Sequence, residues 1–131
     1  MSLFTVSLAH LTKEFKLEML YRSSDFEKIQ ITVEDVNRPA LQLSGFFEHF
    51  EPARTQVIGM VEDTYLAGLT PEQRVIAFDR LFSYRPPALI FARHLEPCNE
   101  CMVMARKYNI TILRTDETTS ELVSTMIATL K

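Results

Sequence analysis

The sequence predicts an α/β fold, a single domain with a mainly parallel sheet flanked by helices. In the last third of the chain, strand-like and helical segments alternate, as they do where helices join parallel strands. The strand-like segments 88–92 and 110–113 are apolar, which is typical of strands covered on both faces. The 131 residues, 47% hydrophobic and 24% charged, match one soluble globular domain. We therefore expect residues 1–131 to form one domain.

The first half of the chain contains patterns for two helices and two strands. Ser7 is a suitable N-cap for a short helix. Alternating apolar and polar residues predict a strand at 17–21, and a run rich in β-branched residues predicts another at 29–33. A helix is predicted to start at 37–39, because proline fits the first helical position, and to end before Pro52. Its side chains expected in the core are Leu43, Phe46, Phe47 and Phe50.

The middle of the chain predicts a buried strand and a long helix. The continuous apolar run at 57–61 is typical of a strand covered on both faces. Residues 70–73, Thr-Pro-Glu-Gln, combine an N-cap, a proline at the first helical position and a capping-box glutamine. They predict a helix that Pro86 and Pro87 end. Its core-facing side chains are expected to be Val75, Phe78, Leu81 and Phe82.

Two further helices are predicted on either side of the last strand. Pro97 is expected to open the first of them, and Asn109 suits the position just after its end. Residues 118–121 form a second capping box and predict the final helix. The expected inner stripes are Cys101, Met104, Ala105 and Tyr108 in the first, and Leu122, Val123, Met126, Ile127 and Leu130 in the second.

Charge and hydropathy argue against nucleic-acid and membrane partners. Fourteen basic and seventeen acidic side chains leave a net charge of −3, whereas nucleic-acid binders normally carry a basic patch. No apolar run approaches the roughly 20 residues that span a bilayer. The first six residues have neither the basic region nor the cleavage site of a secretory signal. We expect a cytoplasmic protein.

Motifs for nucleotide binding and catalysis are absent from the sequence. Its three glycines, at positions 45, 59 and 68, cannot form a P-loop, a dinucleotide-binding fingerprint or a nucleophile elbow. The histidines His10, His49 and His94 are isolated from one another. We therefore predict no catalytic, cofactor-binding or metal-binding residues.

One group of reactive side chains has to be weighed: His94, Cys98 and Cys101. A Cys-x-x-Cys pair at a helix N-terminus can have a lowered thiol pKa, and with the histidine it offers three zinc ligands. A structural zinc site needs four ligands, however, and no second cysteine pair exists. The alternative is that one cysteine packs in the core and the other is partly exposed.

Polar residues follow or precede predicted strands and helices at two places. Asn37 and Arg38 precede a helix, where backbone N–H groups and a guanidinium can hold an anion. Arg114, Thr115 and Asp116 follow a strand and lead into the last helix. Because strand-to-helix turns of a parallel sheet lie together, these five residues are our candidates for a ligand site or an interface. The alternative is that Asp116, Thr118 and Ser120 cap the last helix while the arginines pair with surface carboxylates.

The stretch 37–50, NRPALQLSGFFEHF, resembles a segment of the N-terminal domain of HPr kinase/phosphorylase. The same resemblance extends from about Val6 to Leu130, nearly the whole chain. It is carried by the segments 55–59 with Glu62, 81–84, 95–97, 106–110, and 113–116 with Thr119 and Ser120.

The resemblance implies a function that is divided between two domains. Enzymes of this family phosphorylate a serine of the phosphocarrier protein HPr, and remove that phosphate, in bacterial carbon catabolite repression. Their P-loop, ATP and Mg²⁺ sites belong to a C-terminal domain without counterpart in this sequence, so no catalytic residue is transferred to it and no cofactor is expected here. The implied partners are that catalytic domain and, through the full-length enzyme, HPr, with a hexamer expected only at full length. The implied fold is similar to the N-terminal domain of Mur ligases.

Three functions follow as hypotheses. The first is a non-catalytic assembly or regulatory domain of the kinase/phosphorylase. The second is a sensor of a phosphorylated metabolite or nucleotide, which would be favoured if Arg38 and Arg114 pointed into one crevice. The third is an independent redox or metal protein that uses Cys98 and Cys101. Because no complete site is visible in the sequence, the first is preferred.

Overall fold

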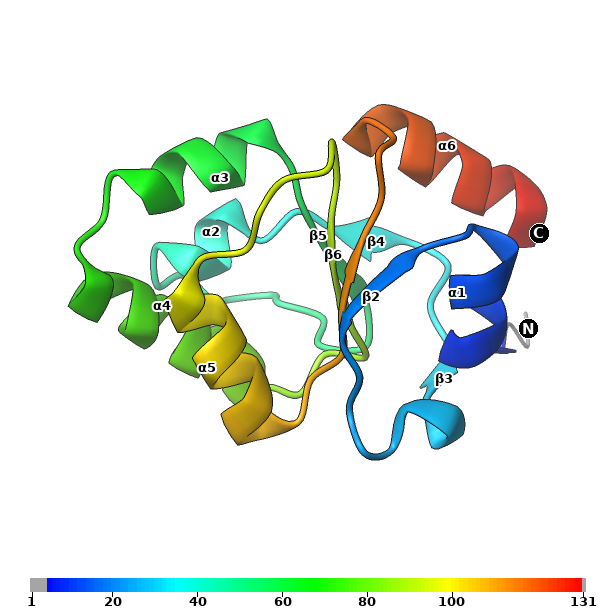
Figure 1. The fold of residues 1–131 in the computed structure, drawn as a ribbon, viewed down its shortest axis with the longest axis horizontal. Helices are drawn as coiled ribbons and strands as arrows, with labels where there is room; N and C mark the ends of the chain where they lie inside the picture. Colours follow the sequence, from blue (N-terminus) through cyan, green and yellow to red (C-terminus); the bar gives the residue numbers. More distant parts are fainter. Residues whose placement is uncertain (1–4, 131) are drawn as a thin grey trace.

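The computed structural model describes the backbone of residues 5–130 and the side chains of residues 5–128 (Figure 1). Its centre is a five-stranded sheet with the strand order β2–β7–β6–β5–β4. Strands β4 to β7 are parallel, and β2 pairs antiparallel with β7 at one edge. The predicted mainly parallel sheet is confirmed. The strands are β2 (Glu18–Tyr21), β4 (Val36–Asn37), β5 (Thr55–Ile58), β6 (Leu89–Phe91) and β7 (Ile112–Arg114).

Helices cover both faces of this sheet, as predicted (Figure 1). One face packs against α1 (Leu8–Glu14) and α6 (Thr119–Leu130). The other packs against α2 (Ala40–Leu43), α3 (Met60–Ala67), α4 (Pro71–Ser83) and α5 (Asn99–Tyr108). Next to α1 lie a 3-10 turn, η1 (Phe26–Lys28), and a small antiparallel ladder of β1 (Val6–Ser7) and β3 (Gln30–Ile31).

Successive residues of the central strands point into two separate cores. Ile90 and Leu113 pack against α1 and α6, whereas Leu89, Phe91 and Ile112 pack against the helices of the opposite face. This alternation is the period-2 geometry of a strand, and it explains why the strand sequences are apolar without interruption. Of the predicted inner residues of α4, Phe78, Leu81 and Phe82 are fully buried and Val75 is half-buried against the same core.

The predicted helix ends are confirmed where a local cap defines them. Ser7 Oγ accepts a hydrogen bond from the His10 amide at 3.0 Å and starts α1. The Thr70–Gln73 and Thr118–Glu121 capping boxes form at the starts of α4 and α6. Asn109 ends α5 in the left-handed conformation, with φ of 59°. The start of α5 lies at Asn99, two residues beyond Pro97, and the predicted position of the Leu130 side chain lies outside the described side chains.

The helix predicted from 37–39 to Phe50 is wrong in most of its length. Asn37 belongs to the edge strand β4, and α2 contains only four residues. Gly45 has a φ of +104°, a left-handed conformation that suits glycine and ends the helix. Phe46 is therefore 47% exposed instead of buried. Phe47 stacks on Tyr84, with ring centroids 4.7 Å apart.

The strand predicted at 57–61 is wrong beyond Ile58. Met60 and Val61 are the first residues of α3 and are 50% and 65% exposed. A short apolar run does not distinguish a strand from a helix start, and here the Glu62 carboxylate caps the turn by accepting the Gly59 amide at 2.7 Å. The strand predicted at 29–33 is present only as β3, and it pairs with β1 outside the main sheet.

Candidate functional site: an arginine-lined crevice

The carboxyl ends of the parallel strands form one rim of the sheet, from which α3 and α6 diverge (Figure 1). A cavity of about 230 Å³ opens at this rim. It receives residues from the segments after β4, β5, β6 and β7, which is the usual place for ligands in parallel α/β sheets. We call it the arginine crevice. Its lining residues are Arg38, Met60, Val61, Arg93, Thr118, Thr119 and Ser120.

Arg38 is held over the turn between β5 and α3. Its Nε and Nη2 atoms donate to Glu62 Oε1 at 3.0 and 2.7 Å, and the Glu62 side chain is buried. A Cβ atom at residue 59 would lie 2.5 Å from Thr119 Oγ1 and 2.6 Å from Arg38 Nη2. A larger residue here would therefore displace the Arg38 and Thr119 side chains from their positions, although the φ of −115° is itself open to any residue. Gly59 lets Arg38 and Thr119 meet above the sheet.

Arg93 comes from the loop after β6 and has a strained backbone. Arg93 and His94 both have a φ of 55°, which is uncommon for residues other than glycine. The loop after β7 holds them, because the Arg93 amide donates to the Glu117 carbonyl at 2.7 Å and the His94 amide to the Thr115 carbonyl at 2.8 Å. Within residues 5–128, the exposed Arg93 guanidinium has no hydrogen-bonded or ion-paired partner.

Carboxylates moderate the positive charge of the arginine crevice. Glu62 directly offsets the charge of Arg38. At the start of α6, hydrogen bonds from Thr118 lower the pKa of Glu121, and the nearby charge of Arg93 lowers it further. The Thr119 and Ser120 hydroxyls have no hydrogen-bond partner in the described part of the chain. Among the described residues, the crevice thus offers the unpaired guanidinium of Arg93, the N–H groups of Arg38 that do not bind Glu62, and the hydroxyl groups of Thr119 and Ser120.

Of the five residues predicted from the sequence, only Arg38 lines this crevice. Asn37 instead donates to Gln42 Oε1 at 2.9 Å and to Gln56 Oε1 at 2.7 Å, and thereby fixes the edge strand β4. Thr115 is buried, and its Oγ1 accepts the Glu117 amide. Asn37 and Thr115 therefore have structural roles within the fold.

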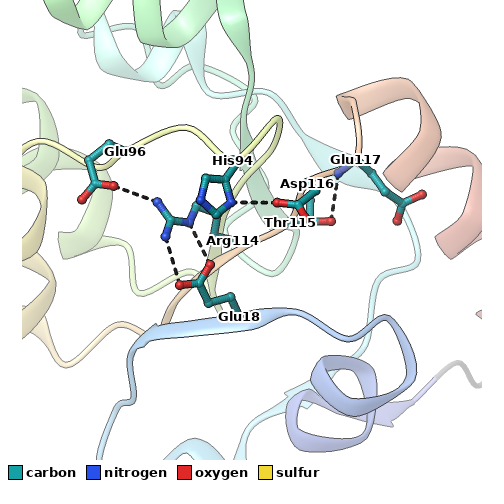
Figure 2. Close-up of polar contacts among 7 residues, drawn as sticks. All are labelled: Glu18, His94, Glu96, Arg114, Thr115, Asp116 and Glu117. Atoms are coloured by element: carbon teal, nitrogen blue, oxygen red, sulfur yellow. Dashed lines mark hydrogen bonds and ion pairs between the residues drawn. The ribbon is translucent and has the colours of Figure 1, made fainter.

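Arg114 and Asp116 make polar contacts next to this crevice, Arg114 in ion pairs and Asp116 with His94 (Figure 2). Arg114 binds both oxygens of Glu18 at 3.0 Å and Glu96 at 2.8 Å. The hydrogen bond from Arg114 is the main cause of a lowered pKa at Glu18. Asp116 Oδ1 lies 2.7 Å from His94 Nδ1.

The structure does not bring Arg38 and Arg114 into one crevice. Strands β5 and β6 separate β7, which carries Arg114, from β4, which precedes Arg38. The arginine that joins Arg38 is Arg93, which our sequence analysis missed. Its position directly after the apolar strand 88–92 was the available signal, because residues at that end of a parallel strand face the rim.

The two cysteines do not have the environment of a redox pair. Cys98 is the N-cap of α5 and half-buried, and burial raises the pKa of its thiol. Cys101 is fully buried, which raises its pKa well above the ordinary value. Both shifts oppose the thiolate that redox chemistry needs. In the described residues, no group of three or more His, Cys, Asp and Glu side chains is arranged to hold a metal ion.

Comparison of the sequence with known proteins shows the family to which the chain is related. The model of the "HPr Serine kinase N terminus" matches residues 6–130, almost the entire chain. The chain belongs to this family. Among similar proteins, the HPr kinase/phosphorylase of Caldicellulosiruptor bescii is 39% identical over 124 residues, and that of Lachnoclostridium phytofermentans is 36% identical over 129 residues. These alignments cover 95% and 98% of the chain but only 40% and 42% of the relatives.

A solved structure supports the fold of this N-terminal family member. The crystal structure of the CBS and DRTGG domains of the regulatory region of Clostridium perfringens pyrophosphatase, complexed with the activator diadenosine tetraphosphate, matches with a TM-score of 0.66. The match covers 95% of this chain and 47% of that chain, at 17% identity. At that identity the likeness concerns the fold alone. Among the described helices, none is both long and apolar enough to cross a membrane.

Proposed function

We propose that this chain is a non-catalytic assembly or regulatory domain of an HPr serine kinase/phosphorylase. The observation that carries the proposal is the match of nearly the whole chain to only about 40% of enzymes with that name. The sequence has three glycines and no P-loop, which supports placing ATP, Mg²⁺ and phosphoryl transfer in the part of the relatives without counterpart here.

The proposal includes the partners and the setting of the domain. Residues 1–131 act as one domain, bound to a catalytic domain in cis, and reach HPr and a hexameric assembly only in the full-length enzyme. The setting is the cytoplasm of a bacterium that regulates carbon catabolite repression. A likeness to the N-terminal domain of Mur ligases remains a prediction of the sequence.

A chimera tests this function. The catalytic part of the Caldicellulosiruptor bescii relative is compared with the same part fused behind this chain. The chain alone is expected to transfer no phosphate to HPr from ATP or pyrophosphate. The fusion is expected to change the ratio of kinase to phosphorylase activity, or the assembly mass, relative to the catalytic part alone. Phospho-HPr formed by the purified chain, or a fusion that behaves like the catalytic part in both measurements, would contradict the proposal.

A second candidate function, a small-molecule sensor, is favoured by the arginine crevice. Among the described residues, Arg93 has no ion-pair or hydrogen-bond partner and Arg38 retains free N–H groups, and guanidinium groups suit phosphate recognition. Thermal unfolding with and without phosphate compounds tests the sensor. A ligand at about 100 times its dissociation constant would stabilise the fold by about 2.7 kcal/mol and raise the midpoint by several degrees. No shift with any phosphorylated compound would refute this second function.

A further inference from the structure

A second, larger cavity adjoins the arginine crevice. It has a volume of about 550 Å³ and lies between the edge strand β4 and helix α6. Arg38, Thr119 and Ser120 line both cavities, so the two open into each other at these residues. We call the second cavity the apolar groove. Its remaining lining residues are Val36, Val123, Ser124 and Ile127.

The apolar groove exists because α6 turns only part of its apolar surface into the core. Leu122 and Met126 are buried against the sheet, whereas Val123 and Ile127, one position further along, are half-buried. At the floor of the groove, Val36 belongs to β4, the last strand of the sheet, and no strand pairs with its outer side in the described chain. Three aliphatic side chains therefore line an open groove.

The chemistry changes along the joined cavities. One end presents Arg93, the N–H groups of Arg38 that do not bind Glu62, and two hydroxyls without a hydrogen-bond partner among the described residues. The other end presents aliphatic surface with few polar groups. A ligand that fits both ends carries a compact anion at one end and a larger, flat or apolar body at the other. The volume of the groove lies in the range of about 300–1,000 Å³ that is usual for small-molecule sites.

The charges within the arginine crevice limit how much negative charge it accepts. Glu62 already offsets Arg38, and Glu121 lies near Arg93. This balance fits the charge of one phosphate group better than that of a triphosphate chain, which proteins usually neutralise with a lysine and a metal ion. The guanidinium of Arg93 and the Thr119 and Ser120 hydroxyls supply hydrogen-bond donors that suit the oxygens of one phosphate.

We infer that the joined cavities bind a nucleoside monophosphate. Its phosphate lies between Arg38 and Arg93, and its base and ribose lie in the apolar groove against Val123 and Ile127. The inference rests on the sensor function proposed above and deepens it, because it names the class of the ligand and the residues that separate a nucleotide from a simple phosphate.

Isothermal titration calorimetry of the chain tests this inference with two nucleotides and three partial ligands. AMP and UMP are compared with adenosine, ribose 5-phosphate and inorganic phosphate. Because the arginine crevice and the apolar groove both contribute to binding, the nucleotides are expected to bind at least about tenfold more tightly than any partial ligand. This factor corresponds to about 1.4 kcal/mol.

Two variants separate the halves of the site. Arg93→Asn removes the guanidinium while asparagine suits the left-handed backbone, and it is expected to weaken nucleotide binding at least about tenfold, again about 1.4 kcal/mol. Ile127→Gln is expected to weaken nucleotide binding and to leave binding of inorganic phosphate unchanged. Arg106→Gln and Val103→Gln, at exposed positions of α5, are the matched controls and are expected to bind as the parent chain does. Circular dichroism of each variant establishes that it is folded.

The failures of the two proposals are distinguishable. If inorganic phosphate and ribose 5-phosphate bind as tightly as the nucleotides and Ile127→Gln has no effect, the nucleotide inference is overturned and the sensor stands. If a nucleotide binds equally well to folded Arg93→Asn, the inferred site is wrong. If none of the five compounds binds, the nucleotide inference is refuted, and the sensor function is refuted as well if thermal unfolding shows no shift with any other phosphorylated compound.

Discussion

Replacement of Glu62 by glutamine tests the contact that positions Arg38. One buried oxygen, Glu62 Oε1, accepts hydrogen bonds from Arg38 Nε, Arg38 Nη2 and the Gly59 amide, at 3.0, 2.7 and 2.7 Å. The Glu62→Gln side chain keeps the shape and an oxygen for the Gly59 amide, but it removes the negative charge. The substitution therefore isolates the ion pair from the helix cap.

The expected size of the effect follows from burial and bond type. Hydrogen bonds to charged groups contribute about 1.5–3 kcal/mol and neutral ones about 0.5–1.5 kcal/mol. The Glu62 side chain is 3% exposed, but that of Arg38 is 38% exposed, so water screens the pair from one side. We expect Glu62→Gln to lower the free energy of unfolding by about 1–2 kcal/mol. Glu62→Ala also leaves the Gly59 amide without a partner and should cost about 3 kcal/mol.

Urea denaturation followed by circular dichroism measures both variants. Glu72→Gln is the matched control, because Glu72 lies in the first turn of α4, is exposed and has no hydrogen-bond partner among the described residues. It should change the free energy of unfolding by no more than about 0.5 kcal/mol. If Glu62→Gln is no more harmful than Glu72→Gln, or if Arg38→Gln and Glu62→Gln act additively in the double variant, the ion pair does not stabilise the rim and the reasoning fails.

Three further predictions concern the rest of the fold. Phe82→Ala, at a fully buried position of α4, should lower the free energy of unfolding in urea by about 3–5 kcal/mol, and a loss below about 1 kcal/mol would contradict the described packing. Cys98 and Cys101, whose thiol pKa values are raised by burial, should react slowly with a disulfide reagent at pH 7 in the folded chain and rapidly in urea, whereas fast labelling of both in the folded chain would speak against their environment. Arg114 lowers the pKa of Glu18 in the folded state, so this pair stabilises the fold above the unfolded carboxyl pKa of about 4.3 and stops doing so as the pH falls through the lower folded value. The stability difference between the parent chain and Glu18→Gln should therefore shrink from pH 7 to pH 3, and a difference that is constant over this range would exclude the pair as its source.

The parts of the fold that local chemistry determines were predictable from the sequence. The caps at Ser7, Thr70 and Thr118 lie within three residues of the amides that they bind, so the sequence alone contains the whole interaction. The helix predicted to reach Phe50 and the strand predicted to reach residue 61 were both based on apolar composition. The first overlooked Gly45, whose positive φ ends α2, and the second overlooked the Glu62 side chain, which caps the Gly59 amide and starts α3.

The candidate site was less predictable, because its residues come from four separate strand ends. Sequence patterns placed Arg38 before a helix and Arg114 after a strand but contain no information on which carboxylates face them. Glu18, 96 residues before Arg114 in the chain, reaches it only because β2 pairs antiparallel with β7. Long-range pairing of this kind decides whether a predicted arginine is neutralised or available.

The two edges of the sheet show what this difference means for function. At the β2 edge, Arg114 binds two carboxylates, so a ligand phosphate would have to displace them. Toward the β4 edge, the guanidinium of Arg93 has no ion-pair or hydrogen-bond partner among the described residues, and it lines an open crevice. Arg114, which the sequence pattern indicated as a candidate, therefore stabilises the fold. Arg93, which the sequence pattern did not indicate, is the arginine available to a ligand. In this family member, the candidate site therefore depends on which arginine at the strand ends lacks a carboxylate partner, because an arginine alone does not identify it.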